Sequence, residues 1–527
     1  MEIINISDKN MEISGGVDIT EKLQHLFDTV NGDTLINLAA GVYYISNQLK
    51  IENWDNVRFV GYGAKIVTHF DPCEPYSYKG AFKITGCKDC SFSGFTITTD
   101  NAPNVLAKVL KIDKEKLTAD LELQMGARLK GNEMFVGFNS LDDDMSPNGH
   151  VWFADNNGYR WHYLRDNVIR LFAYPSTGVQ LKDLEIGEYM CMRHSLYAQC
   201  PLEFTGCSDI EIKDVTINSS PGLACAIHPD SKNFSFLRYR VLSDRKSPQI
   251  FSSNADGIHI TGLRGRLTVK NCFFENLGDD ALNIHNQGAT VYGIDGNVIH
   301  CYAKRFKSTP QSEDGRLSLY WAAPGDKIKV YEKGTFRVKG EFTVLEYTVN
   351  KIVTDKPVSE LEDGDYLANT AYFADTEITG CTVINTRARA FLIETAVTTV
   401  EDCHFYGIVD AALLIGPDMG VWNEMCPVEK LVIRGNVFDK CGCGSGKKKC
   451  GGILLTANDK GDEITHFPTG LHGEVTVENN VFVNMKDTLI FAQSAQKLIL
   501  KDNCITEGTE FAYEPVRTMD CGAVIRE

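Results

Sequence analysis

Two short acidic motifs give this sequence its clearest chemical signal. Asp256 lies in Asn-Ala-Asp-Gly-Ile-His at 254–259, and Asp279 and Asp280 lie in Gly-Asp-Asp-Ala-Leu-Asn at 278–283. Carboxyl groups that lie close together repel one another, which raises the pKa of at least one, so that one keeps its proton near neutral pH while another stays ionised. Hydrolysis of a glycosidic bond requires these two roles. We therefore take the three aspartates as candidate catalytic residues.

The spacing of the motifs indicates how they are brought together. Asp256 and Asp279 are 23 positions apart, which is the length of one coil of a parallel β-solenoid. Neighbouring strands lie about 4.8 Å apart, so residues one coil apart are close when their side chains point the same way. An inverting glycosidase separates its carboxyl groups by roughly 6.5–9.5 Å. Acid and base should therefore differ by a lateral step as well as by one coil, which the adjacent Asp279 and Asp280 can provide.

Strand alternation predicts which side chains of the second motif face outward. Leu282 and Ile284 are apolar and should point into the coil. Asp279, Asn283 and His285 have the opposite parity and should lie on the outer face. The second motif thus presents one carboxylate and two polar partners to the surface.

The other two acids need a local bend to reach that face. Asp280 and Asp256 both share the parity of the core residues that follow them. Gly278 and Gly257 lie beside them, and a glycine in a strand often marks a bulge or bend. We predict a bend at each glycine, without which only Asp279 would be exposed.

Further residues near the acids are candidates for holding a substrate. Arg387 and Arg389 share one parity in a predicted strand, where guanidinium groups could bind hydroxyl groups or orient a carboxylate; a surface ion pair is the alternative. Trp422 lies on a loop that interrupts the repeat, and it either stacks on a sugar ring or covers its own coil. The candidate substrate-binding residues are Asn254, His259, Asn283, His285, Arg387, Arg389, Glu394, Trp422 and Glu424.

A short repeat supports the solenoid. Each copy is a hydrophobic strand beside a polar turn, and Val383 and Phe405 occupy equivalent places 22 positions apart. Phe482 and Ile505 are 23 apart, and Phe438 and Phe482 are 44 apart, which we interpret as two units of 22. Units this short, rich in Val, Ile, Thr and Asn, are typical of a right-handed parallel β-helix. We predict an all-β chain with this architecture.

Two interruptions and one helix complete the predicted fold. The stretches 106–112 and 325–344 alternate like antiparallel strands, which predicts two small inserted β-barrels or sandwiches. Residues 18–27 read as a helix that caps the first coil, with Asp18 at the N-cap and Glu21 three positions later. The predicted segments are the N-terminal cap and first coils at 1–100, an inserted β module at 101–200, coils with the catalytic acids at 201–289, an inserted β-barrel at 290–372, and C-terminal coils at 373–527.

Composition and charge exclude several classes of function. The net charge of −17 disfavours nucleic acid and anionic membrane surfaces, which need clustered Lys and Arg. The chain has no run of roughly 20 apolar residues to span a membrane. It shows no secretory signal, so we expect a cytoplasmic protein unless a leader was removed. Of the 17 cysteines, several that recur in the repeat, including Cys90, Cys272, Cys381 and Cys403, read as reduced core fillers. Because Cys441, Cys443 and Cys450 supply only three thiols, we expect neither a metal nor a cofactor.

Together the motifs resemble glycoside hydrolase family 110, the exo-acting α-1,3-galactosidases, within the β-helix class that includes the polygalacturonase-like family 28. The resemblance is carried by residues 256–259, 278–285, 387–389, 422–424 and 432–438. It implies a pectin-lyase-like solenoid and metal-independent, inverting hydrolysis of terminal α-1,3-linked galactose, on linear or blood-group-B-like glycans. By likeness to family 28, Asp279 would be the general acid, and Asp256 and Asp280 would activate water.

Two other functions are compatible with the sequence. A uronate-acting β-helix lyase or epimerase would neutralise a carboxylate and abstract a proton, commonly with calcium or a basic residue. A noncatalytic glycan-binding β-helix would use the aspartates only to finish turns. Under the leading hypothesis the partner is a galactose-terminated glycan, with no nucleic acid and no membrane, and the sequence is compatible with a homodimer.

Overall fold

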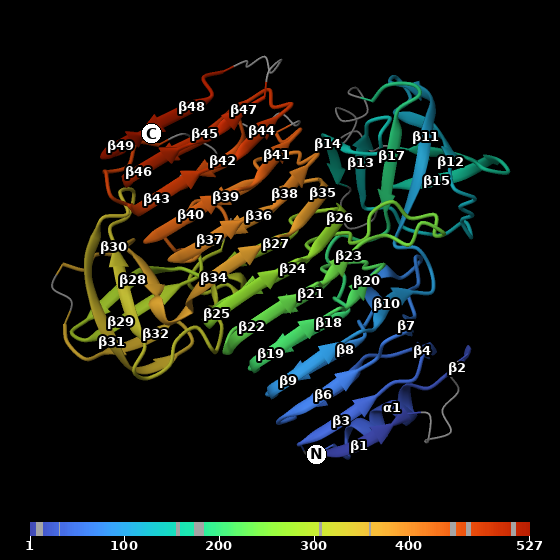
Figure 1. Cartoon of the computed structure of the whole chain (residues 1–527), viewed down its shortest axis with the longest axis horizontal. Helices are drawn as coiled ribbons and strands as arrows, with labels where there is room; N and C mark the ends of the chain where they lie inside the picture. Colours follow the sequence, from blue (N-terminus) through green and yellow to red (C-terminus); the bar gives the residue numbers. More distant parts are fainter. Residues whose placement is uncertain are drawn as a thin grey trace.

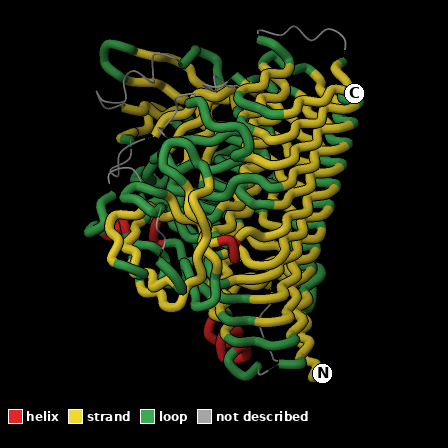
Figure 2. The backbone as a smooth tube through the Cα atoms, turned by 90° about the vertical axis from the view of Figure 1, so that its left-hand side faces the viewer, coloured by secondary structure: helices red, strands yellow, loops and turns green. Residues whose placement is uncertain are grey.

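The chain forms a right-handed parallel β-helix, as the repeat predicts. The computed structural model describes residues 1–6, 14–30, 32–153, 159–172, 184–304, 308–357, 360–442, 449–459, 465–506 and 513–527. Within these residues three long parallel sheets run side by side along one axis, with the N-terminus at one end and the C-terminus at the other (Figures 1 and 2).

The three sheets take one strand each from successive coils. The first sheet runs β1 (Glu2–Asn5), β3 (Thr34–Asn37), β6 (Val57–Val60), β9 (Lys88–Ser93), β19 (Ser208–Lys213), β22 (Ser231–Leu237), β25 (Leu263–Lys270), β34 (Phe373–Thr379), β37 (Val397–Glu401), β40 (Lys430–Arg434), β43 (His472–Glu478), β46 (Ala495–Lys501) and β49 (Ala523–Arg526). The second runs β2 (Ser14–Asp18), β4 (Gly41–Ile45), β7 (Ala64–Thr68), β10 (Thr96–Thr99), β20 (Thr216–Ile217), β23 (Arg240–Val241), β26 (Phe273–Leu277), β35 (Thr382–Thr386), β38 (His404–Tyr406), β41 (Val437–Asp439), β44 (Val481–Val483) and β47 (Cys504–Ile505). The third runs β48 (Val516–Met519), β45 (Thr488–Gln493), β42 (Cys450–Leu455), β39 (Leu413–Ile415), β36 (Phe391–Ile393), β27 (Leu282–His285), β24 (Ile258–Thr261), β21 (Cys225–Ile227), β18 (Leu202–Thr205), β8 (Phe82–Thr85) and β5 (Leu49–Glu52).

Inward-facing side chains of equivalent strands stack to form the core. Phe405 and Phe438 have ring centroids 5.1 Å apart, and Phe438 and Phe482 have centroids 4.9 Å apart. Phe438 pairs directly with Phe482 in adjacent strands. The interval of 44 residues is therefore one coil enlarged by loops, and our interpretation of it as two units was wrong. Cys272, Cys381 and Cys403 are buried free thiols in the same core, as expected of fillers; Cys443 lies outside the described residues.

A single α-helix closes the N-terminal end of the described chain. Helix α1 spans Thr20–Phe27, and its Phe27 packs on Trp54, with ring centroids 5.3 Å apart. The predicted N-cap at Asp18 is wrong by one position, since Ile19 holds that place; Asp18 still accepts a hydrogen bond from the Thr20 N–H at 2.9 Å. None of the described helices is both long and apolar enough to cross a membrane.

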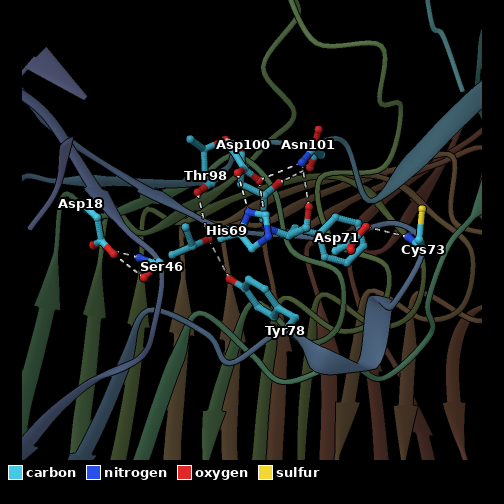
Figure 3. A network of polar contacts seen from close by, with 12 residues as sticks. Asp18, Ser46, His69, Asp71, Cys73, Tyr78, Thr98, Asp100 and Asn101 are labelled. Atoms are coloured by element: carbon cyan, nitrogen blue, oxygen red, sulfur yellow. Dashed lines mark hydrogen bonds and ion pairs between the residues drawn. The ribbon is translucent and has the colours of Figure 1, made fainter. Parts of the chain in front are cut away.

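A polar network fixes the point where the chain leaves the N-terminal coils (Figure 3). His69 Nδ1 lies 2.8 Å from Asp100 Oδ2, and Asp100 Oδ1 accepts from the Phe70 N–H at 2.8 Å. Asn101 donates its side-chain N–H to the Phe70 carbonyl, also at 2.8 Å. The first insertion begins three residues later, at Asn104, so these bonds hold its base against the coils.

Two inserted β modules interrupt the coils, and each has a hydrophobic core of its own. The first is a seven-stranded antiparallel sheet in the order β14 (Pro147–Phe153), β13 (Gly137–Leu141), β17 (Tyr189–Arg193), β11 (Asn104–Asp113), β12 (Thr118–Leu123), β16 (Val168–Phe172) and β15 (Arg160–Arg165). The second is a closed barrel of β28 (Ala289–Asp295), β29 (Val298–Tyr302), β32 (Lys351–Thr354), β31 (Val338–Thr348), β30 (Lys327–Tyr331) and β33 (Tyr366–Asn369). In Figure 1 they lie on opposite flanks of the β-helix.

Candidate active site

The predicted acids lie in a cleft of about 870 Å³ on the outer face of the third sheet. Phe153 of the first insertion lines one part of it, and Ser318, from the segment between β29 and β30, lines another. The sequence-predicted residues that line the cleft are Asp256, His259, Asp279, Asp280, Asn283, His285, Arg387, Arg389, Trp422 and Glu424.

The register of the coils differs by one residue from the predicted one. Strands β24 and β27 pair Ile258 with Leu282, an offset of 24, and the Gly257 N–H donates to the Asp280 carbonyl at 2.8 Å. Asp256 is therefore level with Asp280 on the next coil, and Asp279 supplies the lateral step. All three acids precede the first residue of their strands, so strand parity does not decide where their side chains point.

The two glycines beside the acids allow neighbouring coils to approach closely. A Cβ on Gly278 would lie 2.4 Å from the Asn254 carbonyl oxygen, and one on Gly257 would lie 2.6 Å from that of Ala281. Neither glycine has a positive φ. The chain bends at both glycines, as predicted. The contact between coils is what requires glycine at these two bends.

Gly278→Ala tests this contact. The added methyl group must displace backbone atoms, so we expect the free energy of unfolding to fall by about 1–3 kcal/mol in urea titrations. Gly340→Ala is the matched control, because a Cβ there meets no atom within 4 Å. An equal loss in both variants would contradict the steric explanation.

Two arginines form ion pairs with the acids, and they lie in a turn and not in a strand. Arg387 and Arg389 lie in the turn between β35 and β36, so the predicted strand placement was wrong. Arg387 Nη2 is 2.5 Å from Asp279 Oδ1, and its Nε donates to the Gly278 carbonyl at 2.7 Å. Arg389 binds both oxygens of Asp280, through its backbone N–H at 2.9 Å and Nη2 at 2.7 Å. The arginines thus form ion pairs with Asp279 and Asp280 and hold these carboxylates in place.

The three carboxyl groups differ in charge because only two have an arginine partner among the described residues. Burial opposes ionisation of Asp279, but Arg387 and Arg389 outweigh it and lower its pKa. Burial raises the pKa of Asp280 to about 6 against the pull of Arg389. Burial, and the charges of Asp279 and Asp280, raise the pKa of Asp256 well above its ordinary value. Of the three, Asp256 therefore has the environment that most favours the protonated form.

The acids are closely spaced. One oxygen of each lies within 4.8 Å of one oxygen of the others, which is close enough to share a cation. Arg387 and Arg389 already supply positive charge to Asp279 and Asp280. The spacing is shorter than the roughly 6.5–9.5 Å typical of inverting glycosidases, so distance alone does not favour inversion.

Two residues of the site carried no signal in the sequence. Tyr197 Oη donates to Asp279 Oδ2 at 2.7 Å. Arg193, fully buried at the end of β17, donates to the Asn254 carbonyl at 2.8 Å, and burial together with Arg387 lowers its pKa to about 10. Both come from the end of the first insertion or the link that follows it. Only the folded chain brings them to residues some 60–80 positions away.

Histidines and a glutamate form a second polar group in the cleft. His285 Nδ1 is 3.1 Å from Glu424 Oε1, and its Nε2 is 3.1 Å from Thr261 Oγ1. The His259 ring packs edge-on against His285, with centroids 5.1 Å apart. Asn283 lies beside them and its Oδ1 has no hydrogen-bond partner among the described residues. This group offers polar atoms next to the acids.

Two predicted substrate-binding residues lie outside the cleft. The Asn254 side chain is buried and bonded to protein, accepting from Asn104 and donating to the Pro103 and Ser195 carbonyls. It braces the insertion against the coil. Glu394 lines a neighbouring pocket instead.

The chain is similar in sequence to several curated proteins, although no family model matches it. Alpha-1,3-galactosidase B of Bacteroides thetaiotaomicron is 23% identical over 336 residues, which cover 62% of this chain and 52% of that protein. The protein of the same name from Phocaeicola vulgatus is 22% identical over 545 residues, covering 95% and 86%. That from Akkermansia muciniphila is 26% identical over 327 residues, covering 60% and 40%. Apart from the Phocaeicola protein, the chain spans about half the length of these relatives or less.

Solved structures also align with the chain, at low identity and with TM-scores below 0.5. The A-module of Azotobacter vinelandii mannuronan C-5 epimerase AlgE4 has a TM-score of 0.37 at 11% identity, covering 98% of this chain and 99% of that one. A polygalacturonase from Erwinia carotovora ssp. carotovora has a TM-score of 0.42 at 10% identity, covering 96% and 95%. The sequence relatives confirm the predicted resemblance: this β-helical chain is similar to the α-1,3-galactosidases of glycoside hydrolase family 110.

Proposed function

We propose that the protein is a glycoside hydrolase that removes terminal α-1,3-linked galactose from glycans. The observation that carries this proposal is the group of three carboxyl groups in one cleft, of which Asp256 favours the protonated form and the other two are paired with arginines. That division supplies the acid and the base that glycoside hydrolysis needs. The names of the sequence relatives support galactose as the sugar and α-1,3 as the linkage.

The charges suggest which acid does what. Asp256, which holds the proton, donates it to the departing glycosidic oxygen, and the ionised Asp279 and Asp280 activate the attacking water. This exchanges the roles that likeness to family 28 implies for Asp256 and Asp279. Asp280 is suited to its role because its pKa of about 6 leaves it ionised yet basic near neutral pH.

The bonding of the acids supports single displacement in spite of their spacing. A double displacement needs a carboxylate that moves onto the anomeric carbon. Arg387 and Tyr197 hold the two oxygens of Asp279, and Arg389 holds the two oxygens of Asp280, which weakens both as nucleophiles. Each oxygen keeps a further lone pair, so either carboxylate can still accept a proton from water. We therefore favour attack by water, which gives inversion.

Proton NMR of the first sugar released tests substrate and stereochemistry together. We expect an α-1,3-linked digalactoside to release β-galactose, because water attacks the face opposite the leaving group. Initial α-galactose would contradict inversion. Release of a different sugar, from a panel of α-linked galactosides and N-acetylgalactosaminides, would contradict the proposed specificity.

A further inference from the structure

Arg193 is a buried cation for which the fold provides no ion pair. Its side chain is 2% exposed, and no carboxylate pairs with it among the residues that the structure describes. Its Nε and Nη2 have no hydrogen-bond partner there either. The guanidinium carbon lies 5.6 Å from the centroid of the Phe153 ring and 6.0 Å from that of Phe251, so aromatic faces take the place of an anion. Burying a charge without a partner costs stability, which indicates that this side chain has a role other than holding the fold together.

The guanidinium group joins the two coils that carry the acids. Nη1 donates to the Asn254 carbonyl at 2.8 Å and, more weakly, to the Gly278 carbonyl at 3.4 Å. Asn254 lies two residues before Asp256, and Gly278 lies directly before Asp279. The two carbonyls are one coil apart, at the offset of 24 residues that β24 and β27 share. A single nitrogen therefore links the backbone ahead of one acid motif to the backbone ahead of the other.

Glycines leave room for the flat guanidinium group. A Cβ on Gly137, in β13 of the first insertion, would lie 3.0 Å from Arg193 Nε, and a Cβ on Gly278 would lie 3.0 Å from Nη1. The side chain therefore lies in a slot between the insertion and the coils, with backbone on either side. A guanidinium group is planar and holds its N–H donors in fixed directions, whereas the ammonium group of lysine is a compact charge on a flexible stem. The slot thus favours arginine.

We propose that Arg193 is a positioning residue that the first insertion contributes to the active site: it fixes the distance between Asp256 and Asp279 by joining the backbone that precedes each. Its Nε and Nη2 are enclosed by protein, and its Nη1 is bonded to carbonyl oxygens. Arg193 therefore acts through the acids and not by contact with the sugar. The inference rests on the proposed function, because it takes the acids to be catalytic.

The charge of Arg193 also acts on the acids. Burial opposes ionisation of Asp279, and Arg193 is one of the groups that nonetheless lower its pKa, after the two arginines of the turn and Tyr197. The charged and titratable groups that act on Arg193 itself are Cys191, Tyr197, Asp279 and Arg387. Burial and Arg387 lower the pKa of Arg193 to about 10, which leaves it charged from acid to neutral pH. Removal of this charge should therefore raise the pKa of Asp279.

Arg193→Met tests the proposal, because it removes the charge and the link between the coils but keeps a long apolar side chain between the two rings. We expect kcat for an α-1,3-linked digalactoside to fall about 10²-fold, the effect of misplacing a reacting group by about 1 Å, while KM changes less than about twofold. The acid limb of the kcat–pH profile should move to higher pH, because Asp279 then takes up a proton more readily and no longer activates water. The midpoint of urea unfolding should stay close to that of the natural protein, since no ion pair is lost.

Arg193→Lys separates the charge from the link. Lysine keeps the positive charge without the planar donors, so the acid limb should return to its natural position while kcat stays about tenfold low. Arg170→Met is the matched control, because Arg170 pairs with Asp120 at 2.6 Å within the same insertion and lines a different hollow. It should leave kcat, KM and the pH profile unchanged.

Three results would overturn the proposal. Unchanged kcat in Arg193→Met would show that the link has no role in the reaction. Full recovery of kcat in Arg193→Lys would show that the charge alone is sufficient. A fall in kcat that comes with a lower urea midpoint and an unshifted acid limb would show that Arg193 only stabilises the fold.

Hydrogen exchange separates this inference from the proposed activity. In Arg193→Met the amide hydrogens of residues 254–258 and 278–282 should exchange faster, because the two coils lose the link between their backbones, whereas those of β40 should not change. This result would support the link even if the protein hydrolysed no galactoside. Conversely, unchanged exchange in both segments, with hydrolysis of the digalactoside retained, would support the activity and overturn the inference.

Discussion

Asp256→Asn is expected to lower kcat for an α-1,3-linked digalactoside by about 10²–10⁴-fold, because the glycosidic oxygen then departs without a proton. The same variant should hydrolyse α-galactosyl fluoride at close to the normal rate, since fluoride leaves without protonation. Asp279→Asn should lose both activities, because water activation is needed whatever the leaving group. Steady-state kinetics on the two substrates provide the measurement.

Asp402→Asn is the control for this pair. Asp402 is an exposed turn residue with φ of 53°, a conformation that Asn tolerates, so both activities should be retained. If fluoride hydrolysis survives in Asp279→Asn and is lost in Asp256→Asn, the roles are those implied by likeness to family 28. Full retention of digalactoside hydrolysis in either variant would defeat the catalytic assignment itself.

The architecture could be predicted because it is a local and repeated property of the sequence. The 22-residue interval between Val383 and Phe405 is the true register of β35 and β38. The 44-residue interval between Phe438 and Phe482 is one coil enlarged by loops. The strand pattern on either side of a loop does not depend on the length of the loop, so the pattern could not distinguish one long coil from two short ones. The helix at residues 20–27 could be predicted from its apolar spacing, but its exact start could not, because Ile19 has no side chain that signals a cap.

Only those residues of the site that lie in recognisable motifs could be predicted. The three acids, both arginines and the His285–Glu424 pair come together as residues of adjacent coils. Strand parity could not predict the directions of the acids, because they precede their strands. The ion pairs with Arg387 and Arg389 depend on a turn conformation that alternation does not describe. Tyr197 reaches Asp279 only through the placement of an inserted module, which no local pattern encodes.

Arg387→Leu should destabilise the protein by about 3–5 kcal/mol at pH 7, since it leaves the carboxylate of Asp279 buried without its closest cation. The loss should depend on pH. In the natural protein the lowered pKa of Asp279 gives stability that is present above its ordinary value of 3.8 and lost as pH falls through the lowered value. In the variant, Arg387 no longer offsets burial, so the pKa of Asp279 is raised. Asp279 then takes up a proton as the pH falls, which removes the unpaired buried charge. Urea titrations at pH 7 and pH 4.5 should therefore show a smaller loss at the lower pH.

Two comparisons isolate the buried ion pair as the cause. Arg387→Leu combined with Asp279→Asn should recover much of the stability lost at pH 7, because no unpaired charge then remains at that position. Arg266→Leu removes the same type of pair, 2.7 Å from Glu377 but exposed on both sides, and should cost no more than about 1 kcal/mol. Equal losses at both pH values, or no recovery in the double variant, would show that Arg387 stabilises the turn by packing and through the Gly278 carbonyl, and that the charge of Asp279 is balanced by other groups.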